Sequence, residues 1–219
     1  MERVGIMSRA DELFQIIHER KTIKVLGQAD TPVVVPASVA ERNDPKVRRA
    51  VEVAGMAPFH FPRMKEIAEP WRAYQVWNAE TNTLAKYLAE DCGVKTKEPQ
   101  LMASCSALVL VTWLPEYPQA ETEKERMQEE EHIAAASAMV QNLLLMLTAE
   151  GFGNYWSSGG ILRTPALFEY LGIPQEERLL GAIFIEYPEC AESDAVRKPG
   201  GLRTQRGLDW VQDVSLKPS

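Results

Sequence analysis

The first residues that could do chemistry form a short cationic segment near the N-terminus. In the sequence RKTIK, Arg20, Lys21 and Lys24 surround Thr22. Two or three Arg or Lys donors hold a dianionic phosphate well, and a hydroxyl can add a hydrogen bond. The alternative is a solvated helix end, where cations are favoured by the helix dipole. Because the formal net charge of the chain is −7, the segment would be a local basic site in an acidic protein.

A second candidate segment, APFHFPR, follows a predicted helix and contains two prolines. Its prolines fix the backbone around Pro58, Phe59 and His60. Such a loop could present a histidine and an aromatic ring to a ligand. It could equally fill the core with Phe59 and Phe61, and the sequence leaves both interpretations open.

A third candidate segment, WSSGG, comes after a long apolar run. It comprises Trp156, Ser157, Ser158, Gly159 and Gly160. Backbone N–H groups at the two glycines could reach a ring nitrogen of a flat ligand, an approach that larger residues would block. A tight turn after a helix would explain the same glycines without any ligand.

No side-chain catalytic motif accompanies these segments. The sequence has no GxxxxGK[ST] phosphate loop, no GxSxG elbow and no HExxH pair. Glu129 and His132 form one Glu-x-x-His pair, but a di-iron site needs a second pair on a facing helix. We therefore expect no metal site. Either the protein is not an enzyme, or a cofactor supplies its chemistry.

Composition restricts the class of protein. The 219 residues, 45% hydrophobic and 25% charged, predict one soluble domain spanning residues 1–219. The acidic balance argues against a nucleic-acid partner. The apolar run from Ile133 to Leu147 is interrupted by polar residues, so no membrane partner is expected. Three cysteines without CxxC spacing, and no signal peptide, indicate a cytoplasmic location.

Periodicity predicts helices mixed with irregularly spaced strands, which is the pattern of an α+β fold. The first helix begins at a capping box on Ser8 and ends near Arg20, and a second begins at Asp44 and Pro45. Further helices are expected over 81–90, 130–150 and 164–172, and strands over 71–78, 105–114 and 179–188. The helix over 130–150 is apolar on every side, so it belongs in the domain centre or at a subunit interface.

Taken together, the three segments resemble the FMN-dependent nitroreductase family. RKTIK is similar to the family's Arg-Arg-Ser-x-Arg opening, and Ala57-Pro58 with Glu69-Pro70-Trp71 to its Ala-Pro-Ser and Gln-Pro-Trp elements. The run QNLLLMLTAEGFGNYWSSGG resembles its long helix followed by Gly-Leu-Gly and Trp-x-x-Gly. LGIPQEERLLGAIFIEYP resembles its last strand. The resemblance spans residues 8 to 210, and the histidine loop resembles a minimal subgroup.

The resemblance implies a three-layer α+β fold with a mixed central sheet, and a domain-swapped homodimer with FMN at the subunit interface. Arg20, Lys21, Thr22 and Lys24 would hold the phosphate, ribityl and pyrimidine edge of FMN. Pro58, Phe59 and His60 would line the ring from the partner subunit. The segment from Trp156 to Gly160 would pass along its N5 side. The tail, residues 189–219, would pack on the partner and return Arg203 or Arg206 to the phosphate.

The implied activity is an oxidoreductase that takes hydride from NAD(P)H and reduces nitroaromatic, quinone or similar small-molecule acceptors by a ping-pong mechanism. Positive charge from Lys21 or Lys24 near the N1–C2 edge would stabilise the reduced flavin. His60 would lie on the substrate side, and no side chain is expected to be catalytic.

Two departures from the family pattern leave alternatives open. The segment from 58 to 70 is longer than the family's usual loop, and Glu186 stands where the family usually has a glycine. The loop could alter the substrate pocket. A flavin-binding homologue without catalysis, or a specialised flavin enzyme of the same fold, would then be the alternative.

Overall fold

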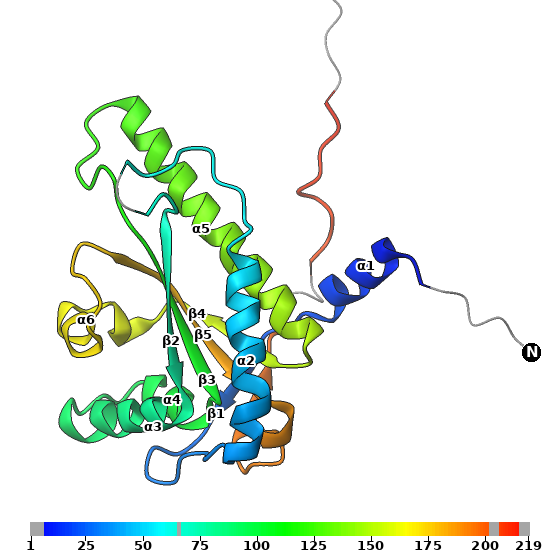
Figure 1. The fold of residues 1–219 in the computed structure, drawn as a ribbon, viewed down its shortest axis with the longest axis vertical. Coiled ribbons are helices and arrows are strands. Elements are labelled where there is room, and N and C mark those ends of the chain that lie inside the picture. Colours follow the sequence, from blue (N-terminus) through cyan, green and yellow to red (C-terminus); the bar gives the residue numbers. More distant parts are fainter. Residues whose placement is uncertain (1–6, 65–66, 202–205, 215–219) are drawn as a thin grey trace, which may run out of the picture.

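A four-stranded sheet between two helical layers organises the computed structural model, which describes residues 7–64, 67–201 and 206–214 (Figure 1). The strands are β2 (Trp71–Trp77), β3 (Ala107–Trp113), β4 (Gly153–Ser157) and β5 (Arg178–Glu186), in the order β2-β3-β5-β4. All three pairings are antiparallel. The expected mixed sheet is therefore wrong for these strands.

A second, two-stranded sheet lies beside the first. It pairs β1 (Ile23–Leu26) with β6 (Val196–Pro199) in antiparallel register. Among the described residues, one isolated parallel backbone bridge, between Thr22 and Asn154, links it to the main sheet. None of β1, β4 and β6 was expected from the sequence.

The helices complete the architecture. They are α1 (Arg9–Glu19), α2 (Ala37–Ala54), α3 (Asn78–Lys86), α4 (Glu98–Ser104), α5 (Glu123–Ala149) and α6 (Pro165–Leu171). A π-helical turn, Tyr87–Asp91, extends α3, and 3₁₀ turns occupy Gly160–Arg163 and Pro188–Cys190. The capping box on Ser8 and the left-handed Gly172 after α6 confirm two sequence-based boundaries.

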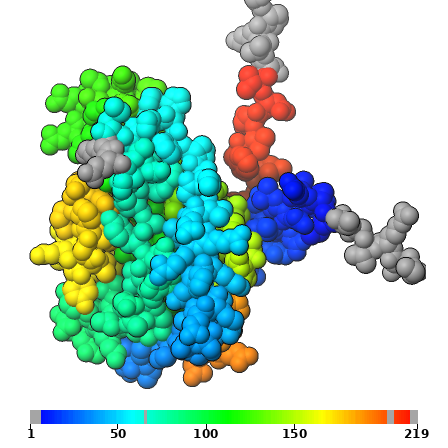
Figure 2. Space-filling view, in the orientation of Figure 1, coloured from blue at the N-terminus to red at the C-terminus, as the bar shows by residue number. Residues whose placement is uncertain are grey.

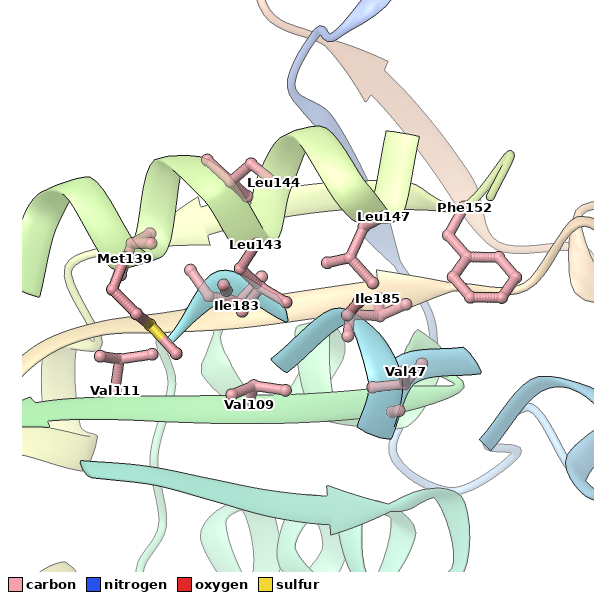
Figure 3. Close-up of a cluster of buried hydrophobic side chains, with 14 of the residues drawn as sticks. Val47, Val109, Val111, Met139, Leu143, Leu144, Leu147, Phe152, Ile183 and Ile185 are labelled. Atoms are coloured by element: carbon pink, nitrogen blue, oxygen red, sulfur yellow. The ribbon is translucent and has the colours of Figure 1, made fainter. Parts of the chain in front are cut away.

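Successive side chains of the inner strands β3 and β5 point to opposite faces of the sheet, so they contribute to two separate hydrophobic cores. Val109 and Ile183 face the layer of α2 and α5, whereas Leu108 and Phe184 face the layer of α3, α4 and α6. Figure 3 shows Met139, Leu143 and Leu147 of α5 stacked over β3 and β5. Strands covered on both faces are apolar throughout, which explains why the runs at β3 and β5 were recognisable in the sequence. The three-layer expectation is confirmed.

The start of α2 differs from the expected one. The helix begins at Ala37, so Asp44 and Pro45 lie inside it rather than at its N-terminus. The Asp44 carboxylate accepts a hydrogen bond from the Tyr187 hydroxyl at 2.6 Å instead of capping a helix. Burial, together with this bond to Asp44, raises the pKa of Tyr187. A tertiary contact therefore uses the residue that local signals assigned to a cap.

The long helix α5 also begins earlier than expected. Thr122 caps it in a capping box with Glu125, so the charged residues from Glu123 onward belong to the helix. By length and composition alone, α5 could cross a membrane. In the structure, residues from Ala135 to Leu147 contribute to the core against the sheet.

Apolar residues of α1 and the tail remain exposed in this single chain. Phe14 on α1 is 69% exposed and Trp210 in the tail is 76% exposed, and Leu13 and Val214 are exposed too. Figure 2 shows α1 and residues 206–214 projecting from the side of the main body. No residue of α1 is buried.

Candidate functional site

Most of the cationic segment and part of the tail line an open cavity of about 550 Å³. Arg20, Lys21 and Thr22 line it together with Arg206. Ile17, Gln141, Gly200 and Gly201 complete its described lining. Three cations, one hydroxyl and no carboxylate among these residues form a donor set suited to a phosphate. The solvated-helix-end interpretation does not account for Arg206, which comes from the other end of the chain.

Backbone pairing creates this cavity. Arg20 ends α1, and the chain then enters β1 through Thr22. The Gly200 N–H donates to the Thr22 carbonyl at 3.0 Å, which brings the tail over the cationic segment. A Cβ at Gly200 would lie 3.0 Å from Cβ of Thr22, so glycine permits this approach. The tail therefore passes close enough for Arg206 to join the same cavity.

Only one of the two candidate tail arginines can be located. Arg206 lines the cavity, whereas Arg203 lies outside the described residues. Spacing along the chain could not choose between them, and Arg203 stays a prediction.

Lys24 has a different neighbourhood from Arg20 and Lys21. It lies on β1 and is not part of the cavity lining. Its ammonium is 6.0 Å from the ring centroid of Tyr155 on β4. Tyr155 directly precedes Trp156, so Lys24 is the residue of the cationic segment that lies near the start of the WSSGG segment.

The parallel backbone bridge between the residue before β1 and β4 brings the cationic segment close to WSSGG. Thr22 pairs with Asn154, three residues before Ser157. The Asn154 amide donates to Thr148 Oγ1 at 3.1 Å, which ties β4 to the end of α5. Two regions far apart in the sequence therefore lie side by side within one chain.

Backbone conformation and packing within this chain require glycine at two positions of this region. Gly159 and Gly160 have φ values of 98° and 52°, which L side chains rarely adopt. A Cβ at Gly159 would lie 2.3 Å from Leu179 Cδ2, and one at Gly160 would lie 2.4 Å from Glu98 Oε1. The Gly159 N–H also donates to Ser157 Oγ at 3.3 Å. These glycines alone are therefore no evidence of a ligand.

The remaining residues of the segment form the end of β4. Trp156 is partly exposed, and its indole packs against Gly181, where a Cβ would lie 2.0 Å from Trp156 Nε1. Ser157 is buried, and Ser158 is exposed with its carbonyl bound by Arg163. The expected turn is thus an edge strand followed by a 3₁₀ turn.

The loop after α2 lies apart from the cavity in this chain. Pro58 and His60 are exposed, and the half-buried Phe59 packs edge-on against Trp71 at 5.6 Å between ring centroids. Phe59 therefore contacts the core, as the core-filling interpretation requires, while His60 remains available to another molecule. No described residue of this loop belongs to the cavity lining.

Glu186, which departs from the family pattern, has a structural role here. Its carboxylate forms an ion pair with Arg197, and both side chains are largely buried. Arg197 lies on β6 opposite Val25 of β1. The pair therefore anchors the two-stranded sheet, including Thr22 and Gly200 beside it, to the end of β5.

Four residues of the described cavity lining were not predicted as site residues: Ile17, Gln141, Gly200 and Gly201. Gln141 is one of the polar residues that interrupt the apolar run from Ile133 to Leu147, and that interruption was the available signal. Gly200 and Gly201 form a dipeptide typical of turns and close backbone approaches. No cluster of potential metal ligands occurs among the described residues, and Glu129 and His132 instead bind backbone groups.

Comparison with known proteins agrees with these features. The model of the nitroreductase family matches residues 43–185. The curated protein named "Putative NAD(P)H nitroreductase YfhC" of Bacillus subtilis is 28% identical over 198 residues, covering 85% of this chain and 90% of that protein.

Solved structures show the same fold. A nitroreductase-like family protein from Bacillus cereus has a TM-score of 0.59 at 20% identity, with coverage of 94% of this chain and 98% of that one. A structure titled a putative nitroreductase in complex with FMN, from Desulfovibrio desulfuricans, has a TM-score of 0.59 at 20% identity, covering 97% and 100% of the two chains.

Proposed function

The chain belongs to the nitroreductase family, and on that premise we propose that it is an FMN-dependent oxidoreductase. It would take hydride from NAD(P)H and reduce nitroaromatic, quinone or similar acceptors in a ping-pong cycle. The relative named as an NAD(P)H nitroreductase and the fold shared with an FMN complex support this proposal.

The observation that carries the proposal is the cationic cavity. Arg20, Lys21 and Arg206 converge on about 550 Å³ of open space in a chain of net charge −7. Their chemistry fits the phosphate of FMN, and the Thr22 hydroxyl adds a donor. The residues present therefore fit the phosphate end of the cofactor.

When bound, FMN supplies the redox chemistry by accepting a hydride equivalent and passing electrons to the acceptor. The protein's own residues would bind the cofactor and orient it. Arg20, Lys21 and Arg206 neutralise the phosphate, and Lys24 places positive charge beside β4 for the pyrimidine edge. Trp156, Ser158 and Gly160 are exposed and would line the ring.

The other part of the site would come from a second copy of the chain. In the proposed domain-swapped homodimer, Pro58, Phe59 and His60 line the ring of the partner's cofactor, with His60 on the substrate side. The exposed apolar residues of α1 and of the tail support this, because water would be excluded from them in a dimer. Since β6 pairs with β1 of the same chain, the described tail residues left for a partner are 206–214.

Anaerobic reduction tests the function. The protein reconstituted with FMN should lose its yellow colour on addition of NADPH or NADH, and regain it when a nitroaromatic or quinone is added. Colour that persists with both donors would contradict the proposal. It would instead indicate a flavin-binding homologue without this activity, an alternative that the long 58–70 segment favours.

A further inference from the structure

Three buried polar side chains and one partly buried carboxylate connect the 58–64 segment to α5 and to the segment after β3. They are Arg63, Glu116, Glu129 and His132, and we refer to them as the loop clamp. Glu129 and His132 are one helical turn apart on α5, and each contacts a different segment. His132 is only 2% exposed.

Glu129 fixes the segment after β3. Its Oε1 accepts hydrogen bonds from the backbone N–H groups of Glu116 and Tyr117, at 2.7 and 2.5 Å. A buried carboxylate is stable when backbone donors satisfy it in this way. The position of Glu116 is therefore set from α5.

His132 fixes the 58–64 segment. Its Nε2 lies 3.1 Å from the carbonyl oxygen of Phe61, and because that oxygen can only accept, Nε2 carries the proton. Phe61 directly follows His60 and packs edge-on against it at 4.6 Å between ring centroids. Phe59 is held by Trp71 on the other side. His60 is thus exposed between two anchored residues.

Arg63 and Glu116 close the clamp. Arg63 is 5% exposed, and its Nε lies 3.5 Å from Glu116 Oε2. Burial lowers the pKa of Arg63, and the nearby Glu116 carboxylate opposes that shift. The segment bearing His60, the segment after β3 and α5 therefore form one cross-linked unit.

We infer that His132 is a positioning residue for the acceptor side of the site, acting through the Phe61 carbonyl on Phe59 and His60. The inference rests on the proposed function, because it assigns His60 to the substrate side. Glu129 and Arg63 support the same unit from its other two edges. A displacement of about 1 Å at a reacting centre is enough to cost up to about a hundredfold in rate.

A series of substitutions at His132 separates the hydrogen bond from the volume of the ring. In His132→Gln the amide nitrogen is as many bonds from Cα as Nε2 of histidine, so it can still donate to Phe61. In His132→Asn the amide is one bond shorter, and His132→Ala has no donor. Ser137→Ala is the control on the same helix, because Ser137 bonds only to the Ile133 carbonyl one turn away.

The kinetic readout is the KM for a quinone acceptor, measured beside the rate of flavin reduction by NAD(P)H. We expect His132→Ala and His132→Asn to raise this KM about tenfold, while flavin content and the rate of the reductive half-reaction stay near wild type. His132→Gln should restore KM to within about threefold of wild type. In a His60→Ala background, His132→Ala should have little further effect, because its effect passes through His60.

Hydrogen exchange gives a second readout that needs no activity. Backbone amides of residues 58–64 should exchange faster in His132→Ala and His132→Asn than in wild type, His132→Gln or Ser137→Ala. Unchanged KM and exchange in His132→Asn would overturn the inference, as would fully additive effects of His60→Ala and His132→Ala. A wild-type protein that binds no flavin, or is not reduced, would contradict the proposed function, whereas the exchange result would still report whether His132 holds the segment.

Discussion

Two arginine-containing regions of this molecule differ in how their charges are satisfied. Arg63 is 5% exposed and lies against Glu116, within a cluster that also contains Glu129 and His132. Arg20 and Arg206 instead line an open cavity with Lys21, and no carboxylate is among the described lining residues. The first region holds a carboxylate beside its arginine, whereas the second is open to solvent and, on the proposed function, receives the phosphate of FMN.

On the proposed function, this difference separates the charged groups that serve the fold from those that serve a ligand. A buried charge must be paired inside the protein, because losing its hydration is costly. A cationic cavity that stays open to solvent avoids that cost and can accept an anion. We therefore expect loss of the Arg63 charge from the loop clamp to change stability, and substitutions of the cavity cations to change cofactor affinity.

The largest expected effect is a loss of stability on substitution of Arg63 in the loop clamp. Arg63→Ala should lower the free energy of unfolding by about 3 to 5 kcal/mol, because it leaves Glu116 buried without its partner. Urea denaturation followed by circular dichroism measures this. The matched control is Arg126→Ala, which removes an exposed ion pair with Glu123 and should cost less than about 1 kcal/mol. Equal losses in the two variants would contradict the distinction between the regions.

On the open side, Arg20→Ala should weaken FMN binding by about tenfold to a hundredfold, since a hydrogen bond to a charged group contributes about 1.5 to 3 kcal/mol. Flavin content after purification and titration of the apoprotein measure the loss. Arg9→Ala, a substitution at the far end of the same helix α1, is the control. Equal flavin content in Arg20→Ala and Arg9→Ala would remove Arg20 from the phosphate site.

The WSSGG segment allows a test of whether its glycines serve the fold. Gly159→Ala should destabilise the protein by about 2 kcal/mol, because positive φ and contact with Leu179 act together. At Gly151, φ is also positive but a Cβ would meet nothing within 4 Å, so Gly151→Ala should cost about 1 kcal/mol. Thermal unfolding of the two variants compares them. If Gly159→Ala were fully stable but lost flavin, the glycine would serve the ligand instead.

The smallest effect concerns an exposed charge. Hydrogen bonds from Arg42 and Asn43 lower the pKa of Glu189 below its ordinary value. A carboxylate whose folded pKa is lowered stabilises the protein above its unfolded pKa, and this contribution is lost as the pH falls through the folded value. Glu189→Gln should therefore make stability slightly less sensitive to acid than wild type. Glu192→Gln, at an exposed neighbour, should not, and an identical acid limb in Glu189→Gln and wild type would contradict the assignment.

The sequence predicted those parts of the fold whose signals are local. The apolar runs at β3 and β5 reflect burial on both faces, and the capping box at Ser8 begins α1. The start of α2 was wrong because Asp44 binds Tyr187, 143 positions away. The strands β1, β4 and β6 were missed because they are short and exist through pairing with distant segments.

The candidate site likewise contains residues that a local pattern predicted and residues that only the tertiary structure identified. Composition was enough to single out Arg20, Lys21, Thr22 and Lys24 as a candidate anion-binding segment, and the structure places the first three of them in one cavity lining. Choosing Arg206, or noticing Gln141 and Gly200, required the approach of the tail to Thr22, which no local pattern encodes. The roles of Pro58, Phe59 and His60 depend on a second copy of the chain, so they stay predictions.

The central claim is that Arg20, Lys21 and Arg206 bind the phosphate of FMN, and riboflavin tests it most directly because it lacks only that phosphate. The apoprotein should bind FMN at least tenfold more tightly than riboflavin, and Arg20→Ala and Arg206→Ala should each reduce this ratio while leaving riboflavin affinity nearly unchanged. Equal affinities for FMN and riboflavin in the wild type, or a ratio unaffected by both substitutions, would contradict the account.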